Sequence, residues 1–121
     1  MNNEMELMKE TIESANEYIQ RVIDGIGGIV YNLQSGREEK ALPLCSDLFE
    51  GLKWLIECAN LTKPLQKDRG IIIDSEEINT ILEDITKAFE NKDYVLLADL
   101  LEYEFMPIIS GWKTQFENIL K

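Results

Sequence analysis

The chain contains no histidine, and this absence removes several kinds of chemistry. Histidine is the commonest general base, the residue that activates serine and cysteine nucleophiles, and the usual nitrogen ligand of zinc. Di-iron helical bundles also need it, because their helices carry Glu-x-x-His pairs. The sequence therefore predicts a protein that has no catalytic residues, binds no metal and needs no cofactor.

Basic residues are scarce as well. Only 12 lysines and arginines accompany 23 aspartates and glutamates, which gives a net charge of −11. Most of such a surface would repel a nucleic-acid backbone or an anionic membrane. We therefore expect neither nucleic acid nor a membrane as a partner.

The sequence also lacks a long apolar run and a basic leader. No stretch approaches the roughly 18 apolar residues that cross a bilayer. The first ten residues carry three glutamates where a signal peptide has basic residues. These features predict a cytoplasmic protein, in which Cys45 and Cys58 are free thiols because two cysteines are too few for a disulfide scaffold.

What the chain does have is apolar residues at alternating spacings of three and four, the period of amphipathic helices. With 121 residues and 45% hydrophobic content, it is long enough to form one domain, residues 1–121, with a real core. We predict an all-α, up-and-down four-helix bundle with a kinked C-terminal helix. The expected helices cover about 5–33, 38–61, 75–90 and 93–120.

Two segments interrupt this pattern. Around Gly25, Gly27 and Gly28 the stripe stays in phase, which favours a continuous helix with a close-packed or bendable section over a break. The connection 64–74 contains the run Ile71–Ile73, which we expect to plug one end of the bundle. In the next helix, Asp74 and Glu77 are predicted to form a capping box, while Asp93 caps the last helix.

Pro107 lies inside the last helix. An interior proline removes one hydrogen bond and clashes with the carbonyl four residues earlier. We therefore expect a kink between Tyr103 and Pro107, or two separate helices. The kinked form is favoured because the apolar stripe continues across the proline.

The last helix is apolar nearly all round. With Leu101 facing the core, Leu96 and Tyr103 point away from it, and Leu100 lies between them in sequence. On the second helix, the outer side opposite Leu52 carries Trp54, Cys58 and Leu61. These residues are either covered by neighbouring elements or free to meet a partner. The predicted partner-binding residues are Leu96, Leu100, Tyr103 and Trp54.

The stretch from Asp93 to Trp112, DYVLLADLLEYEFMPIISGW, resembles the C-terminal signature of small bacterial helical proteins, chiefly from Firmicutes, without an assigned activity. The resemblance implies no catalytic residues. In size, acidity and helix content the chain is also similar to flagellar and type III export chaperones, which shield an amphipathic segment of a client.

From these features we predict a non-catalytic adaptor, chaperone-like or regulatory bundle that binds another protein or a second copy of itself. The alternative is a small ligand-binding or carboxylate-based enzyme bundle. Asp99, Glu102 and Glu104 are close enough in sequence for the latter, although an acidic solvated face is the simpler interpretation of them.

Overall fold

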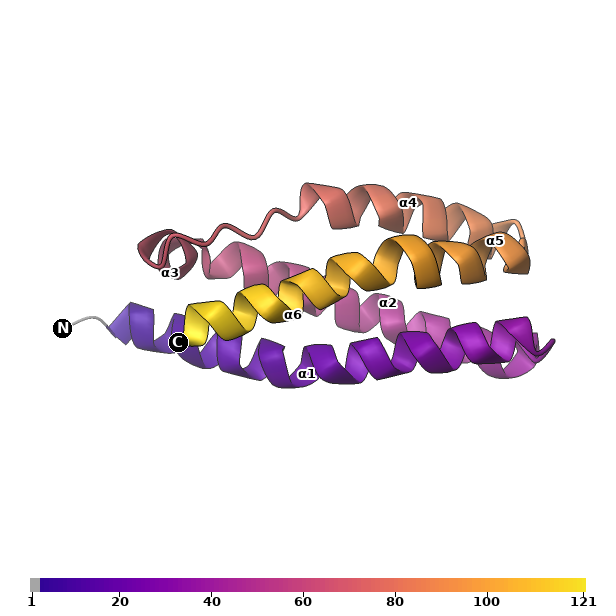
Figure 1. The fold of residues 1–121 in the computed structure, drawn as a ribbon, viewed down its shortest axis with the longest axis horizontal. Helices are drawn as coiled ribbons and strands as arrows, with labels where there is room; N and C mark the ends of the chain where they lie inside the picture. Colours follow the sequence, from indigo (N-terminus) through magenta and orange to yellow (C-terminus); the bar gives the residue numbers. More distant parts are fainter. Residues whose placement is uncertain (1–2) are drawn as a thin grey trace.

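The computed structural model describes residues 3–121, most of which are helical. Four helical columns run alternately up and down, so the chain forms the predicted up-and-down four-helix bundle (Figure 1). The last column consists of three consecutive segments, α5, η1 and α6, and η1 is a π-helix. The elements are α1 (Asn3–Gln34), α2 (Glu38–Leu61), α3 (Lys63–Asp68), α4 (Glu76–Glu90), α5 (Tyr94–Asp99), η1 (Leu100–Phe105) and α6 (Met106–Leu120).

The core follows the long axis of the bundle and consists of the inward stripe of each column. Residues spaced three and four apart share one helix face, so each stripe points inward along its whole length. Helix α1 contacts both α2 and α6. The largest fully buried side chains are Ile12, Ile19, Ile26, Ile29, Leu52, Leu55, Ile73, Ile78, Ile85, Leu97, Phe105 and Phe116.

Helix α1 continues through its three glycines, as its in-phase stripe predicts. The prediction of a close-packed section there is wrong. A Cβ added at Gly25, Gly27 or Gly28 would meet no atom of a neighbouring element within 4 Å. These glycines therefore leave open space on the helix surface and do not bring another helix of this bundle closer.

Helix α2 begins at Glu38 and ends at Leu61, as predicted, with Pro43 inside it. The predicted place of Cys45 in the core is confirmed. Cys58 was predicted to lie on the outer side of the helix, and this prediction is wrong because only 3% of the residue is exposed. It lies on the flank of α2 against which α1 packs.

The short helix α3, which the sequence did not predict, forms a corner with the end of α2. The fully buried Gln66 holds this corner. Its amide nitrogen donates to the Ala59 carbonyl at 2.6 Å and to Oγ1 of Thr62 at 3.1 Å. Its amide oxygen accepts from the backbone N–H of Ile73 at 3.0 Å. Because both ends of the buried amide are satisfied, the corner and the connection after it are held in one arrangement.

The run Ile71–Ile73 does not plug the bundle as a unit. Ile73 is buried, as predicted, but Ile72 points outward and is largely exposed. Ile71 is partly buried against the core, so of the three residues Ile72 alone stays largely outside it.

The starts of α4 and α5 are both capped by an aspartate. The Asp74 carboxylate accepts from the backbone N–H of Glu76 at 3.0 Å, whereas the side chain of Glu77 makes no hydrogen bond to residues 3–121, so the reciprocal half of the predicted capping box is absent from this part of the chain. Asp93 accepts from the backbone N–H of Leu96 at 3.2 Å, which confirms its predicted role as N-cap.

The disturbance predicted around Pro107 takes the form of the π-helix η1 within one continuous column. The backbone N–H of Met106 donates to the carbonyl of Leu101, five residues earlier. A wider turn ahead of the proline relieves the clash of its ring with the carbonyl of Tyr103. The column is therefore not divided into two helices, and its irregular part starts three residues before the predicted one.

Candidate protein-binding surfaces

The second apolar face predicted for the last column is only partly exposed. Leu96 and Tyr103 have exposed fractions of 44% and 68%, and Val95, next to Leu96 in the chain, reaches 77%. The prediction for Leu100 is wrong, since its 8% exposure places it inside the bundle. Leu100 precedes the core-facing Leu101 by one position and therefore points to the flank that α4 covers. We call Val95, Leu96 and Tyr103 the α5–η1 strip.

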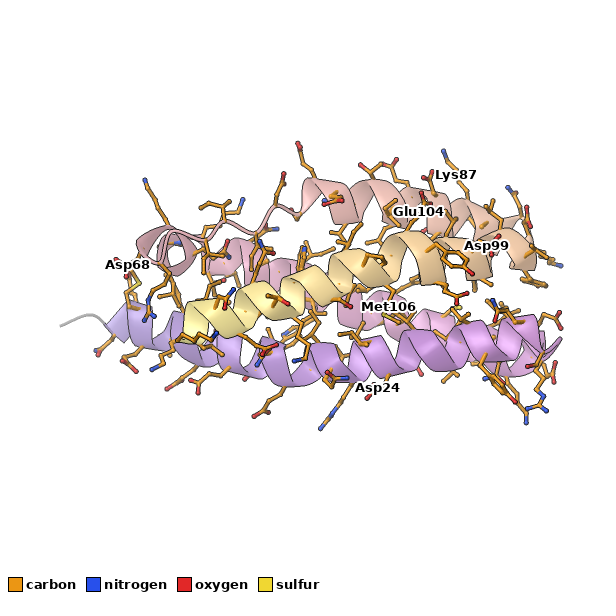
Figure 2. All side chains as sticks on the ribbon, viewed as in Figure 1. Asp24, Asp68, Lys87, Asp99, Glu104 and Met106 are labelled. Carbon is orange, nitrogen blue, oxygen red and sulfur yellow. The ribbon has the colours of Figure 1, made fainter. Side chains whose placement is uncertain are left out.

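Leu96 also lines a hollow of about 290 Å³ between α4 and α5, to which Tyr103 does not contribute. Leu100 and Ala88 provide its apolar lining. Charged groups lie around them, and Figure 2 shows Lys87 at the outer side of α4. The hollow is lined by Asp84, Lys87, Ala88, Asn91, Asp93, Leu96 and Leu100.

Trp54, the remaining predicted contact residue, belongs to a different surface, along the seam between α1 and α2. It is 39% exposed. Its ring meets that of Tyr18 edge-on, with the ring centroids 5.4 Å apart and the planes at 89°. Such a pair contributes about 0.5–1.5 kcal/mol beyond its burial and fixes the orientation of both rings. Trp54 and Leu96 line hollows between different helix pairs, so the predicted residues do not form one surface.

Gly51 on α2 allows this aromatic pair to form. The Tyr18 ring lies directly against the α2 backbone, and a Cβ at position 51 would stand 2.9 Å from Cε2 and Cζ of the ring. Glycine inside a helix costs about 1 kcal/mol relative to alanine. Here that cost is offset by the close approach of the tyrosine.

Three adjoining hollows of about 410, 370 and 220 Å³ follow the seam of α1 and α2. Trp54 lines the first and the second, and Tyr18 lines the second and the third. We call this series the α1–α2 groove. Leu7 of α1 and Leu61 of α2 line its first hollow, and they are 60% and 63% exposed.

At the opposite end of the α1–α2 groove, two glycines of α1 form part of the lining. Gly25 and Gly28 of α1 line the third hollow opposite Leu44 and Asp47 of α2. Since a Cβ at either glycine would meet open space, the two glycines widen this end of the groove.

Sequence reasoning missed Leu7 and Tyr18, although a signal for them exists. At about 100° per residue, Leu7, Tyr18 and Gly25 lie within about 20° of one another around α1. They form a second, broken stripe beside the core stripe. What the sequence does not show is that this stripe faces Trp54 and Leu61 of α2, because that depends on how the two helices pack.

The charges lining the α1–α2 groove are mostly negative. Its lining includes the carboxylates of Glu10, Asp47, Glu50 and Glu57, and one cation, Arg21. Within residues 3–121 the ion pairs are Asp68 with Arg69 and Lys113 with Glu117, both outside the groove. The groove carboxylates therefore have no cation of the described chain paired with them.

Cys58 lines the hollow between Leu7 and Leu61. Burial first, and the negative charge of Glu57 second, raise the pKa of its thiol to about 11. Burial raises the pKa of the Cys45 thiol, in the core, to about 11 as well. Because the thiolate is the reactive form, both cysteines are poor nucleophiles at neutral pH.

The carboxylates considered for an enzyme do not form a cluster. Glu102 accepts a hydrogen bond from the side chain of Gln34 at 3.0 Å, and Asp99 and Glu104 lie exposed at separate points along the last column (Figure 2). Within residues 3–121 no group of three or more acidic or cysteine side chains is placed to hold a metal ion. None of the described helices is long and apolar enough to cross a membrane.

The structure thus defines the class of protein: it is an all-α bundle with a groove along the seam between α1 and α2. A family described as a domain of unknown function (DUF8042) matches residues 10–115, and the chain belongs to this family. An uncharacterized protein of Treponema pallidum (strain Nichols) is 30% identical over 88 residues, which are 67% of this chain and 44% of that protein. The chain spans less than half the length of this relative. No solved structure matches the chain with statistical significance.

Proposed function

We propose that the chain is a non-catalytic protein-binding bundle with an adaptor, chaperone-like or regulatory role, and that the α1–α2 groove is its main binding surface. One observation carries the proposal. Three large apolar side chains, Leu7, Trp54 and Leu61, meet at one hollow from two helices and remain 39–63% exposed. Single exposed leucines are ordinary, but a cluster around a hollow is typical of a binding site.

The proposal includes a chaperone-like mode of action. Flagellar and type III export chaperones, to which the chain is similar in size, acidity and helix content, shield an amphipathic segment of a client. Helices α1 and α2 run antiparallel beside each other (Figure 1), and the exposed apolar side chains along their seam offer such a segment a surface to pack against. A cytoplasmic location belongs to the same proposal, because a client is shielded there before export.

The competing hypothesis is a small ligand-binding or carboxylate-based enzyme bundle. The chemistry of the α1–α2 groove favours binding over catalysis. Its thiol, Cys58, is held in the protonated form by a pKa of about 11. A carboxyl group that acts as general acid usually sits in a buried, apolar pocket, whereas Glu10 and Glu57 are exposed.

A matched pair of double variants tests the proposed function. Leu7→Lys with Leu61→Lys places two charges in the groove, and Tyr31→Lys with Ile72→Lys makes the same change at exposed apolar residues outside the groove and the α5–η1 strip. All four side chains are largely exposed, so both variants should melt close to the wild type.

We expect a protein to be enriched with the wild type and the control, but not with the groove variant, in quantitative purifications from the native cell. That protein, once purified, should bind the wild type in calorimetry and bind the groove variant at least about tenfold more weakly, because an anchor contact contributes about 1–2 kcal/mol or more. Equal binding by all three proteins would reject the groove as the main surface.

A further inference from the structure

We infer that the α1–α2 groove takes a basic amphipathic helix of another protein. The inference rests on the proposed function and adds the chemistry of the partner. Three features of the groove carry it: its length, the distribution of its apolar and small side chains, and its charge.

The length of the groove fits a helix. Its lining on α1 runs from Leu7 to Ile29. At 1.5 Å per residue these positions are about 30 Å apart along α1, the length of a helix of about 20 residues. A helix satisfies its own backbone hydrogen bonds, so it can lie against an apolar floor that offers none.

The side chains of the groove fit one apolar face of such a helix. One end offers Leu7, Trp54 and Leu61 for large aliphatic or aromatic side chains. At the other end, Gly25 and Gly28 leave space in which an incoming side chain or backbone approaches α1 closely. A helix that presents apolar residues at spacings of three, four and seven would contact both ends at once.

The negative charge of the groove lining favours a basic helix over an acidic or uncharged one. Arg21 is the one cation in the groove lining, against Glu10, Asp47, Glu50 and Glu57. An acidic or uncharged helix would partly desolvate these carboxylates without pairing them, which is unfavourable. Lysine or arginine on both flanks of the apolar face would pair with them.

The same charge disfavours a second copy as the occupant. A second copy could offer, for example, its α5–η1 strip, with Asp99 and Glu104 exposed in the same column, or its own groove, which carries the same carboxylates. A copy with a net charge of −11 would bring like charges to the groove carboxylates. A separate, basic protein segment is the complementary occupant.

The probe for this inference is a synthetic peptide of about 20 residues with leucines at helical spacing and lysines on both flanks, called here the lysine peptide. A second peptide replaces every lysine by glutamate, and a third has the lysine composition in scrambled order. Calorimetry on the wild-type chain gives the affinities. The fluorescence of Trp54 shows whether a peptide binds in the groove. It is measured in a Trp112→Phe variant, which lacks the other, buried tryptophan.

We expect the lysine peptide to bind and to shift Trp54 emission to the blue, whereas the glutamate and scrambled peptides do not. Glu10→Gln with Glu57→Gln should weaken binding about fivefold, because two pairings between carboxylates and lysines are lost. Glu83→Gln with Glu90→Gln changes the net charge equally on α4 and should leave affinity within about twofold.

Several results would overturn the inference. Equal loss of affinity in both glutamine variants would mean attraction to net charge alone, and equal binding of the glutamate peptide would remove the charge argument. The lysine peptide could fail to bind although Leu7→Lys with Leu61→Lys still abolishes binding of the native partner. That result would reject the basic helix as the occupant but leave the proposed function intact. Self-association that this same variant abolishes would identify a second copy as the occupant.

Discussion

Single glycines shape the α1–α2 groove in two opposite ways. Gly51 is covered by a neighbour, because the Tyr18 side chain lies so close that it would clash with a Cβ there. Gly25 and Gly28 are not filled by any neighbour in the bundle, although they line the same groove. The first glycine brings two side chains of the groove together, and the other two leave room for something outside the described chain.

Burial of the two cysteines gives a prediction for pH. A pKa of about 11 against an unshifted 9.0 leaves about a hundredfold less thiolate at pH 8. Alkylation of Cys45 and Cys58 by iodoacetamide, followed by mass spectrometry, should therefore be slow in the folded protein and rise towards pH 11. The urea-denatured chain should show an inflection near pH 9. The same inflection in the folded chain would contradict the assigned burial.

The raised thiol pKa also determines how the free energy of unfolding depends on pH. A raised pKa means that the folded state holds the thiol proton more tightly than the unfolded state, so the contribution is complete below pH 9.0 and is lost as pH rises to about 11. Replacing Cys58 by alanine should flatten this part of the stability profile. An unchanged slope would count against the shift at that thiol.

At the level of elements, α1 is a long helix weakened at one section. Gly25, Gly27 and Gly28 each lower helix propensity and make no contact that a methyl group would disturb. A glycine that is not needed for packing or for backbone conformation is a candidate for a functional role in the groove. Position 27 differs from the other two because it does not line the groove.

Alanine substitutions separate stability from binding in α1. Gly25→Ala with Gly28→Ala should stabilise the protein by up to about 1 kcal/mol per site in urea melts. The same change fills the third hollow and should weaken the lysine peptide in calorimetry. Gly27→Ala, the control, should stabilise without changing affinity. Unchanged affinity in both variants would show that the peptide does not reach this end of the groove.

Periodicity predicts the elements of this fold well because it reports directly on which face is buried. It places both ends of α2 correctly and carries α1 through its glycines. It does not predict α3, which depends on the buried hydrogen bonds of Gln66 with residues outside that helix. Nor does periodicity predict where η1 begins, because the apolar pattern of the last column continues through the π-helix without an interruption that would mark its start.

The binding surfaces were harder to predict than the helices. Leu96, Tyr103 and Trp54 are exposed as expected, but Leu100 and Cys58 are buried on flanks that neighbouring helices cover. Helical phase gives the direction of a side chain from its own axis and not the neighbour that covers it. For the same reason, the apolar pattern of α1 or of α2 alone does not predict the α1–α2 groove, which both helices form together.

At the scale of the whole molecule, a net charge of −11 opposes contact between copies. The α5–η1 strip nonetheless exposes three apolar side chains, and it is separate from the α1–α2 groove. Salt changes the balance between charge repulsion and apolar attraction. The screening length falls from about 30 Å at 0.01 M to about 3 Å at 1 M ionic strength, whereas apolar attraction is not screened.

Self-association through the α5–η1 strip should therefore grow with ionic strength, and light scattering should show a larger mass at about 1 M than at about 0.01 M salt. Leu96→Ser with Tyr103→Ser should remove this growth and leave the melting curve nearly unchanged, because the two side chains are 44% and 68% exposed. Binding of the lysine peptide should also persist, since neither residue lines the α1–α2 groove. Unfolding of this variant would mean that the strip belongs to the core, and unchanged growth with salt would reject it as an interface between copies.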